Sequence, residues 1–101
     1  MPYWSIKTAL SDPTVKALPE PVRRAYGVLL LGRINETFAI YTSQEIEQLL
    51  LYLFRGMPIS WIKTTIDLLT EHGFMWEYDG EIHISKPYQI ETMQIDWKNA
   101  E

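Results

Sequence analysis

The chain has 101 residues, enough for one domain built around a single hydrophobic core. Hydrophobic residues make up 47% of it, which argues against intrinsic disorder, and the absence of cysteine excludes disulfides and thiol chemistry. The formal net charge of −4 counts against a dedicated DNA-binding domain, because such domains are usually basic.

The N-terminal third predicts two helices separated by prolines. Asp12 stands before a proline, a pattern typical of a helix N-cap, so we expect a brief helix from Thr14 to Leu18. Two further prolines open a second helix, expected from about Val22 to Leu31. Arg23 and Arg24 should lie together on its exposed side.

A short strand and a capped helix follow. Thr37–Tyr41 is predicted to be a strand, with Phe38 and Ile40 on one face. Thr42 and Glu45 have the spacing of a capping box, which opens a helix that runs to about residue 54. Apolar residues at helical spacing define its buried stripe: Ile46, Leu49, Leu50 and Leu53.

The next helix is expected to begin after Pro58 and to end at His72, with Gly73 closing it. Its apolar spacing predicts that Ile59, Ile62, Ile66 and Leu69 are buried. The residues expected to be exposed are Ser60, Lys63, Thr64, Asp67, Thr70 and Glu71.

A β-hairpin should follow, with the strands Phe74–Tyr78 and Glu81–Ser85 on either side of Asp79-Gly80. A two-residue turn would pair Trp76 with His83 and leave one apolar set facing water. A three-residue loop with a bulge at Gly80 would pair Trp76 with Ile82 and place the apolar residues of both strands on one face. Because a one-residue shift turns over a whole strand, we expect the bulged register. Its outer face would then carry Glu77 opposite Glu81, with Asp79 at the tip, so the hairpin should be acidic.

The order helix, turn, helix, hairpin is that of a winged helix-turn-helix. We therefore expect a mainly α (α+β) fold with a small antiparallel β-sheet, formed by the strand near residue 40 and the hairpin. The winged-helix domain should span residues 1–90, and residues 91–101 should form a polar tail.

The chain resembles the N-terminal winged-helix domain of phage replisome organiser proteins, relatives of the DnaD-type replication initiators. The resemblance covers roughly residues 3–90 and follows mainly the pattern of a winged-helix core. The matching segments are Tyr3–Lys7, Asp12–Leu18, Leu29–Leu31, Ile40–Thr42, Glu45–Ile46, Ile66–Phe74 and Asp79–Ile84.

This resemblance implies a phage- or prophage-encoded protein that acts at a replication origin in the bacterial host cytoplasm, with double-stranded DNA as its partner. The start of the chain lacks the pattern of a signal peptide, and no apolar run approaches the length that spans a bilayer. We therefore expect a cytoplasmic protein without a membrane partner.

DNA binding would place the second helix of the motif in the major groove, where Ser60, Lys63 and Thr64 would contact bases. Phosphates would be held by Arg55, Arg23 and Arg24. The acidic hairpin, together with Asp67 and Glu71 on the same helix, would repel phosphate.

The alternative is a small acidic phage winged-helix protein that binds a protein, as an inhibitor or adaptor of a host factor. The two helices of the motif carry more apolar residues than one buried stripe requires. Leu51, Phe54 and Trp61 would form the contact surface with a second copy of the chain or with a host protein. In the other interpretation, the aromatic residues of the termini cover this surface.

Signals of catalysis are nearly absent. The two histidines, His72 and His83, lack paired metal-ligand spacing, and there is no glycine-rich phosphate loop. Glu77, Glu81 and His83 on the hairpin offer at most a weak surface metal site. We therefore expect that the protein is not an enzyme and that it has neither a metal site nor a cofactor.

Overall fold

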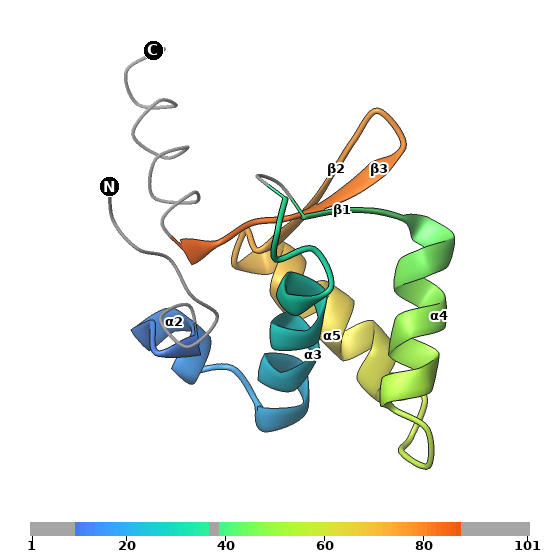
Figure 1. Ribbon diagram of the computed structural model, residues 1–101. Helices are drawn as coiled ribbons and strands as arrows, with labels where there is room; N and C mark the ends of the chain where they lie inside the picture. Colours follow the sequence, from blue (N-terminus) through green and yellow to red (C-terminus); the bar gives the residue numbers. More distant parts are fainter. Residues whose placement is uncertain (1–9, 37–38, 88–101) are drawn as a thin grey trace.

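The computed structural model describes residues 10–36 and 39–87, which form an α+β domain. The helices lie together beneath a small antiparallel sheet in the view of Figure 1, and the β-hairpin projects beyond them. The α+β class and the winged-helix order of elements are as predicted. The elements are α2 (Pro13–Lys16), α3 (Glu20–Leu31), β1 (Ala39–Thr42), α4 (Ser43–Leu53), α5 (Ser60–Glu71), β2 (Met75–Tyr78) and β3 (Glu81–Ile84). The domain boundary predicted at residue 90 lies outside the described residues.

The first two helices begin as the sequence indicates. Asp12 caps α2, its Oδ1 atom accepting the backbone N–H of Thr14 at 2.9 Å. The second helix, α3, begins at Glu20, two residues before the predicted Val22. Pro19 is its N-cap and Pro21 lies in its first turn, where a missing N–H would have no helical partner in any case. The two arginines of α3 differ: Arg24 is exposed, whereas Arg23 is half-buried and its Nη1 donates to the carbonyl of Lys16 at 3.3 Å.

The predicted capping box at the start of α4 is confirmed. The Thr42 hydroxyl oxygen accepts the Glu45 N–H at 3.1 Å, and Glu45 Oε1 accepts the Thr42 N–H at 2.9 Å. The other carboxylate oxygen of Glu45 lies 2.9 Å from Arg33 Nη2. The start of α4 is therefore attached both to the end of β1 and to the turn that follows α3.

The face of α5 that points to the core matches the predicted stripe except at the start of the helix. Leu69 is fully buried and Ile62 and Ile66 are half-buried against the core, but Ile59 is 76% exposed. The core instead receives Thr65, whose hydroxyl donates to the carbonyl of Trp61 one turn earlier at 2.7 Å. A threonine that satisfies its hydroxyl within its own helix needs no other partner, so it can occupy a core position.

The sheet has the order β1-β3-β2, and both pairings are antiparallel. The strand predicted at residues 37–41 is observed at Ala39–Thr42, with Ala39 and Tyr41 buried and Ile40 half-buried. Phe38, expected to share a face with Ile40, lies outside the described residues.

The predicted bulged register of the hairpin is wrong. Trp76 pairs with His83 and Tyr78 with Glu81, so the turn has two residues. Asp79 and Gly80 have φ values of 53° and 79°. Two successive residues with positive φ characterise the type I′ turn, whose twist matches that of antiparallel strands.

The register prediction assumed that Phe74 belongs to the strand. In the structure Phe74 precedes β2 and is buried against Tyr26, with 4.7 Å between the ring centroids. Phe74 therefore does not require Trp76 to face the core. Trp76 lies on the other face, stacked on His83 with 4.2 Å between centroids.

This register also changes the placement of the hairpin carboxylates. Glu77 is paired with Ile82 rather than with Glu81, so the two glutamates lie on opposite faces. Glu77, Asp79 and Glu81 are nevertheless all exposed. The hairpin is acidic, as predicted.

A single core joins the helices to the sheet. The hydroxyl of buried Tyr26 on α3 donates to the carbonyl of Ser85 after β3 at 2.6 Å. The hydroxyl of buried Tyr41 on β1 donates to the carbonyl of Leu29 at 2.5 Å. Phe54 is only 3% exposed and belongs to this core.

Candidate functional site: a groove between α4, α5 and the hairpin

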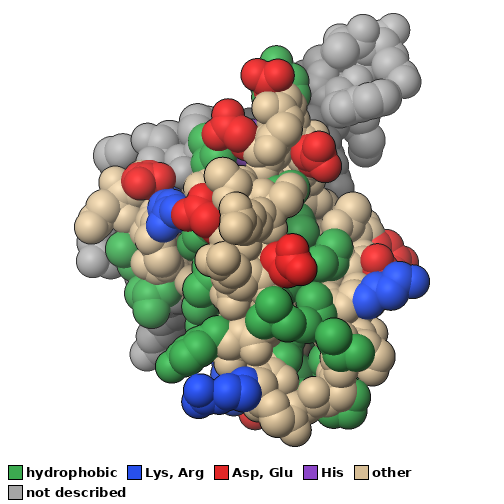
Figure 2. Space-filling view, turned by 90° about the vertical axis from the view of Figure 1, so that its right-hand side faces the viewer, with side chains coloured by type: hydrophobic (Ala, Val, Ile, Leu, Met, Phe, Trp, Pro, Cys, Tyr) green, Lys and Arg blue, Asp and Glu red, His purple; other side chains and the backbone are tan. Residues whose placement is uncertain are grey.

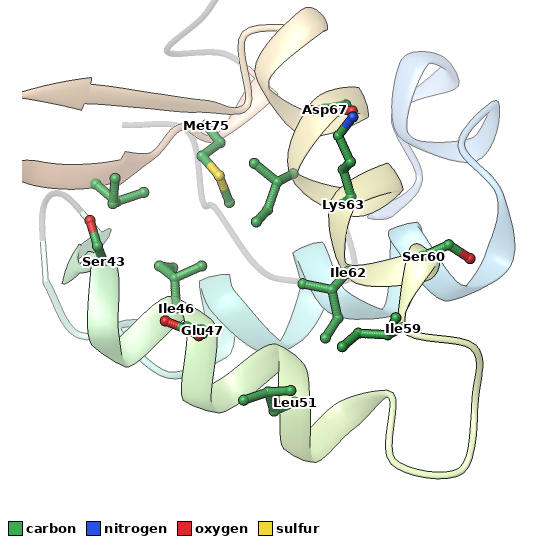
Figure 3. A pocket seen from close by; sticks show the side chains of 12 residues that line it. Ser43, Ile46, Glu47, Leu51, Ile59, Ser60, Ile62, Lys63, Asp67 and Met75 are labelled. Carbon is green, nitrogen blue, oxygen red and sulfur yellow. The ribbon is translucent and has the colours of Figure 1, made fainter.

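A groove of about 700 Å³ lies between α4 and α5 and extends to the inner face of the hairpin (Figure 3). Its volume falls within the range of sites that bind ligands or peptide side chains. The residues that line it are Ser43, Ile46, Glu47, Leu51, Ile59, Ser60, Ile62, Lys63, Ile66, Asp67, Met75 and Ile82.

The walls of the groove are apolar because two helices and two strands each turn hydrophobic side chains toward it. On α5, Ile59, Ile62 and Ile66 have the spacing of one helical stripe. Ile62 and Ile66 are half-buried against the core, as the sequence predicted, and their remaining exposed surface lines the groove. On α4, Leu51 is 48% exposed. The floor of the groove, formed by Ile46 and Met75, belongs to the core, whereas Ile59 and Leu51 at its rim are open to solvent.

Two carboxylates and one ammonium group lie among the lining residues. Glu47 projects from α4, and Lys63 and Asp67 lie one turn apart on the outer side of α5 (Figure 3). Lys63 is therefore next to a group of opposite charge on its own helix. The charged lining of the groove is negative by one unit.

The surface beyond the groove is also acidic. Figure 2 shows hydrophobic side chains gathered in the lower half of this face and acidic side chains spread over its upper half. The exposed carboxylates of the hairpin continue the negative surface from β2 to β3, and Glu71 is exposed at the end of α5. Such a field favours positively charged partners and opposes phosphate.

The residues predicted to contact DNA are found at several places in the structure. Ser60 and Lys63 line the groove, whereas Thr64 is half-buried and does not. Arg55 is exposed in the turn after α4, with its guanidinium carbon 5.2 Å from the centroid of the Tyr52 ring.

Arg23 and Arg24 are part of a different hollow. Together with Lys16 they line a depression of about 800 Å³ on α2 and α3, which shares no lining residue with the groove. These two arginines therefore line a different hollow from Ser60 and Lys63.

The three residues predicted to form a protein interface lie in different environments. Leu51 lines the groove, Phe54 is buried in the core and Trp61 is half-buried against it. Ile59, which was predicted to be buried, is the most exposed large hydrophobic side chain among the described residues. A signal for it existed, because α5 carries two apolar lines and only one of them can face the core.

The α4 side of the groove is positioned by the capping box. The hydrogen bond from the Thr42 N–H holds the pKa of the Glu45 carboxyl below its ordinary value of 4.5, and the Thr42 hydroxyl and Arg33 act in the same direction. The ionised carboxylate secures the first turn of α4, from which Ser43, Ile46 and Glu47 reach the groove.

Within residues 10–36 and 39–87, no group of three His, Asp or Glu side chains is placed to hold a metal ion. His83 is stacked on Trp76, and His72 is exposed at the end of α5. None of the helices in the same residues has the length and apolar character needed to cross a bilayer.

Comparison with protein-family models, with curated proteins and with solved structures finds no match to this chain.

Proposed function

We propose that this winged-helix-like domain is a protein-interaction module that binds its partner in the groove between α4 and α5. The observation that carries this proposal is the exposure of Ile59 and Leu51, 76% and 48%, at an apolar groove with acidic surroundings. Exposed contiguous apolar surface of this kind marks interaction sites in folded proteins.

The position of the groove supports a protein partner over DNA. In a winged helix that reads DNA, the exposed face of the second helix and the wing meet the duplex. Here the exposed face of α5 presents isoleucines together with Lys63 and Asp67, and the hairpin presents carboxylates. Neutralising phosphates requires lysines and arginines, which this surface does not gather.

DNA binding at a replication origin, as in the phage replisome organiser proteins, is the second candidate. It is favoured by the order of elements and by Ser60 and Lys63, which lie in the N-terminal half of the helix that would enter the major groove. Arg55 in the preceding turn would add a phosphate contact.

A displayed library of random peptides, selected against the folded domain, tests the first proposal. We expect enriched peptides whose binding falls at least about tenfold in Ile59→Asp, because a charge replaces an apolar contact. Ile34→Asp is the matched control: Ile34 is 40% exposed and lies outside the groove, so its substitution should leave binding unchanged.

A parallel titration with random duplex DNA at two salt concentrations separates the candidates. Protein binding predicts no complex at micromolar concentrations of the domain. A complex that weakens steeply with salt and is lost in Lys63→Glu would establish the DNA function instead. Failure to enrich peptides, or enrichment that is insensitive to Ile59→Asp, would overturn the protein proposal.

A further inference from the structure

Resting on this proposed function, we infer that the partner segment is a basic amphipathic α-helix. Its apolar stripe fits between α4 and α5, and its flanking lysines and arginines face Glu47, Asp67 and Glu77, the glutamate on the same face of the hairpin as Ile82. Helices with anchors at i, i+3, i+4 and i+7 are a common class of groove-binding segment.

The walls of the groove favour a helix over an extended segment. Away from their terminal turns, the backbone N–H and C=O groups of α4 and α5 are paired within those helices, and the polar side chains of the lining are few. An extended segment pressed against this apolar surface would leave its own backbone groups unpaired, at a cost in free energy for each one. A helix satisfies its backbone internally and presents only side chains to the groove.

The charges around the groove indicate which charge the partner should carry. Among the lining residues, Glu47 and Asp67 outnumber Lys63, and the exposed Glu71 continues the negative surface along α5. Basic side chains flanking an apolar stripe would meet this field favourably, which increases both specificity and the rate of association.

The same charges disfavour a second copy of this chain as the occupant. The chain carries a net charge of −4, and a two-fold symmetric contact through the groove would bring its carboxylates against their own copies. Like charges brought together in an interface oppose association.

Three synthetic peptides of about 18 residues test the inference, because that length lets a helix form readily. All three carry leucines that repeat at positions i, i+3, i+4 and i+7. The first has lysines at the flanking positions, the second has glutamates there, and the third is the lysine peptide with a central proline that prevents a continuous helix. Binding to the domain is measured by fluorescence anisotropy at low and at physiological salt.

We expect the lysine peptide to bind at micromolar concentrations and at least about tenfold more tightly than either of the others. Its affinity should fall about fivefold in the double variant Glu47→Gln with Asp67→Asn, and it should not change in Glu20→Gln, an exposed glutamate of α3 outside the groove. Raising the salt concentration should also lower the affinity of the lysine peptide.

The inference is overturned if the glutamate peptide or the proline peptide binds as tightly as the lysine peptide. It is also overturned if sedimentation shows a dimer that Ile59→Asp dissolves, because the occupant is then a second copy. In each of these cases the peptide library still reports groove binding that depends on Ile59, so the loss of this inference is distinguishable from the loss of the proposed function.

Discussion

Tyr26 links the helical layer to the sheet through a single atom. Its hydroxyl, on α3, donates to the carbonyl of Ser85, 59 residues later in the chain. The ring is fully buried and packs against Phe74. Burial, assisted by the charge of Asp12, raises the pKa of Tyr26 well above its ordinary value of 10. Folding therefore favours the neutral phenol over the ionised one.

Tyr26→Phe should destabilise the domain by about 1–2 kcal/mol at pH 7, because the Ser85 carbonyl loses its donor in a buried place. A group whose pKa is raised on folding contributes stability that is complete below the unfolded pKa, near 10, and is lost as pH rises above it. We thus expect wild-type stability to fall above pH 10, by up to about 1.4 kcal/mol per pH unit from Tyr26.

Denaturant unfolding between pH 7 and 11 measures both effects. The alkaline slope should be shallower in Tyr26→Phe but still present, because burial also raises the pKa of Tyr41. Equal slopes in the two proteins would show that Tyr26 is not buried as a neutral phenol.

Among the elements, α4 depends most clearly on local chemistry. Its first turn is closed by the reciprocal hydrogen bonds of Thr42 and Glu45, and Arg33 joins it to the turn after α3. These contacts lie within a few residues of one another, so the capping box was predictable from residue types and spacing. The hairpin is the opposite case, because its turn residues are compatible with two registers.

Thr42→Ala should lower the free energy of unfolding by about 1 kcal/mol, since the Glu45 N–H loses its acceptor. For a domain of this size the melting temperature should fall by about 4–8 °C. Thermal unfolding followed by circular dichroism measures this, with Thr42→Ser as the variant that keeps the hydroxyl. Thr70→Ala, at an exposed position of α5, is the neutral control. If Thr42→Ala melts at the same temperature as this control, the capping box contributes nothing to stability.

Glu45 in α4 should also make the stability of the domain depend on pH in the acid range. The pKa of Glu45 is lowered on folding, so its contribution is present above the ordinary value of 4.5 and is lost as pH falls through the lower folded value. The free energy of unfolding of Glu45→Gln should therefore be lower than that of the wild type at pH 7, and this difference should shrink below pH 4.5.

Considered as a whole, the molecule has one core, and the placement of α5 decides which apolar residues belong to it. The core takes Leu69 and Thr65 from α5 and Phe54 from the end of α4. What remains apolar on the outer side of α5, from Ile59 onward, forms one wall of the groove. The candidate site therefore lies at the edge of the core, where Ile46 and Met75 meet the exposed side chains of Ile59 and Leu51.

A stability measurement on Phe54→Ala and Ile59→Asp should distinguish a core residue from a groove residue. Phe54 is 3% exposed, so its truncation should cost about 3–5 kcal/mol. Ile59 is 76% exposed, so even a charge there should change the free energy of unfolding by less than about 0.5 kcal/mol. Urea unfolding of both variants gives the comparison. A large loss in Ile59→Asp would return that residue to the core and remove the groove.

Local sequence was sufficient for the order of the elements, the Asp12 cap, the capping box of α4 and the acidic character of the hairpin. Helix starts and turns depend on hydrogen bonds between residues a few positions apart, and residue types specify them directly. The α+β class follows from that order.

Only the tertiary structure decided how much of the α5 stripe is buried, which register the hairpin adopts and where Phe54 lies. Each of these is a competition between apolar surfaces of similar size, and the outcome depends on contacts with residues far away in the chain. Thr65 illustrates the reason: its hydroxyl is satisfied within its own helix, so a position that appears polar in the sequence packs in the core while Ile59 is left at the surface.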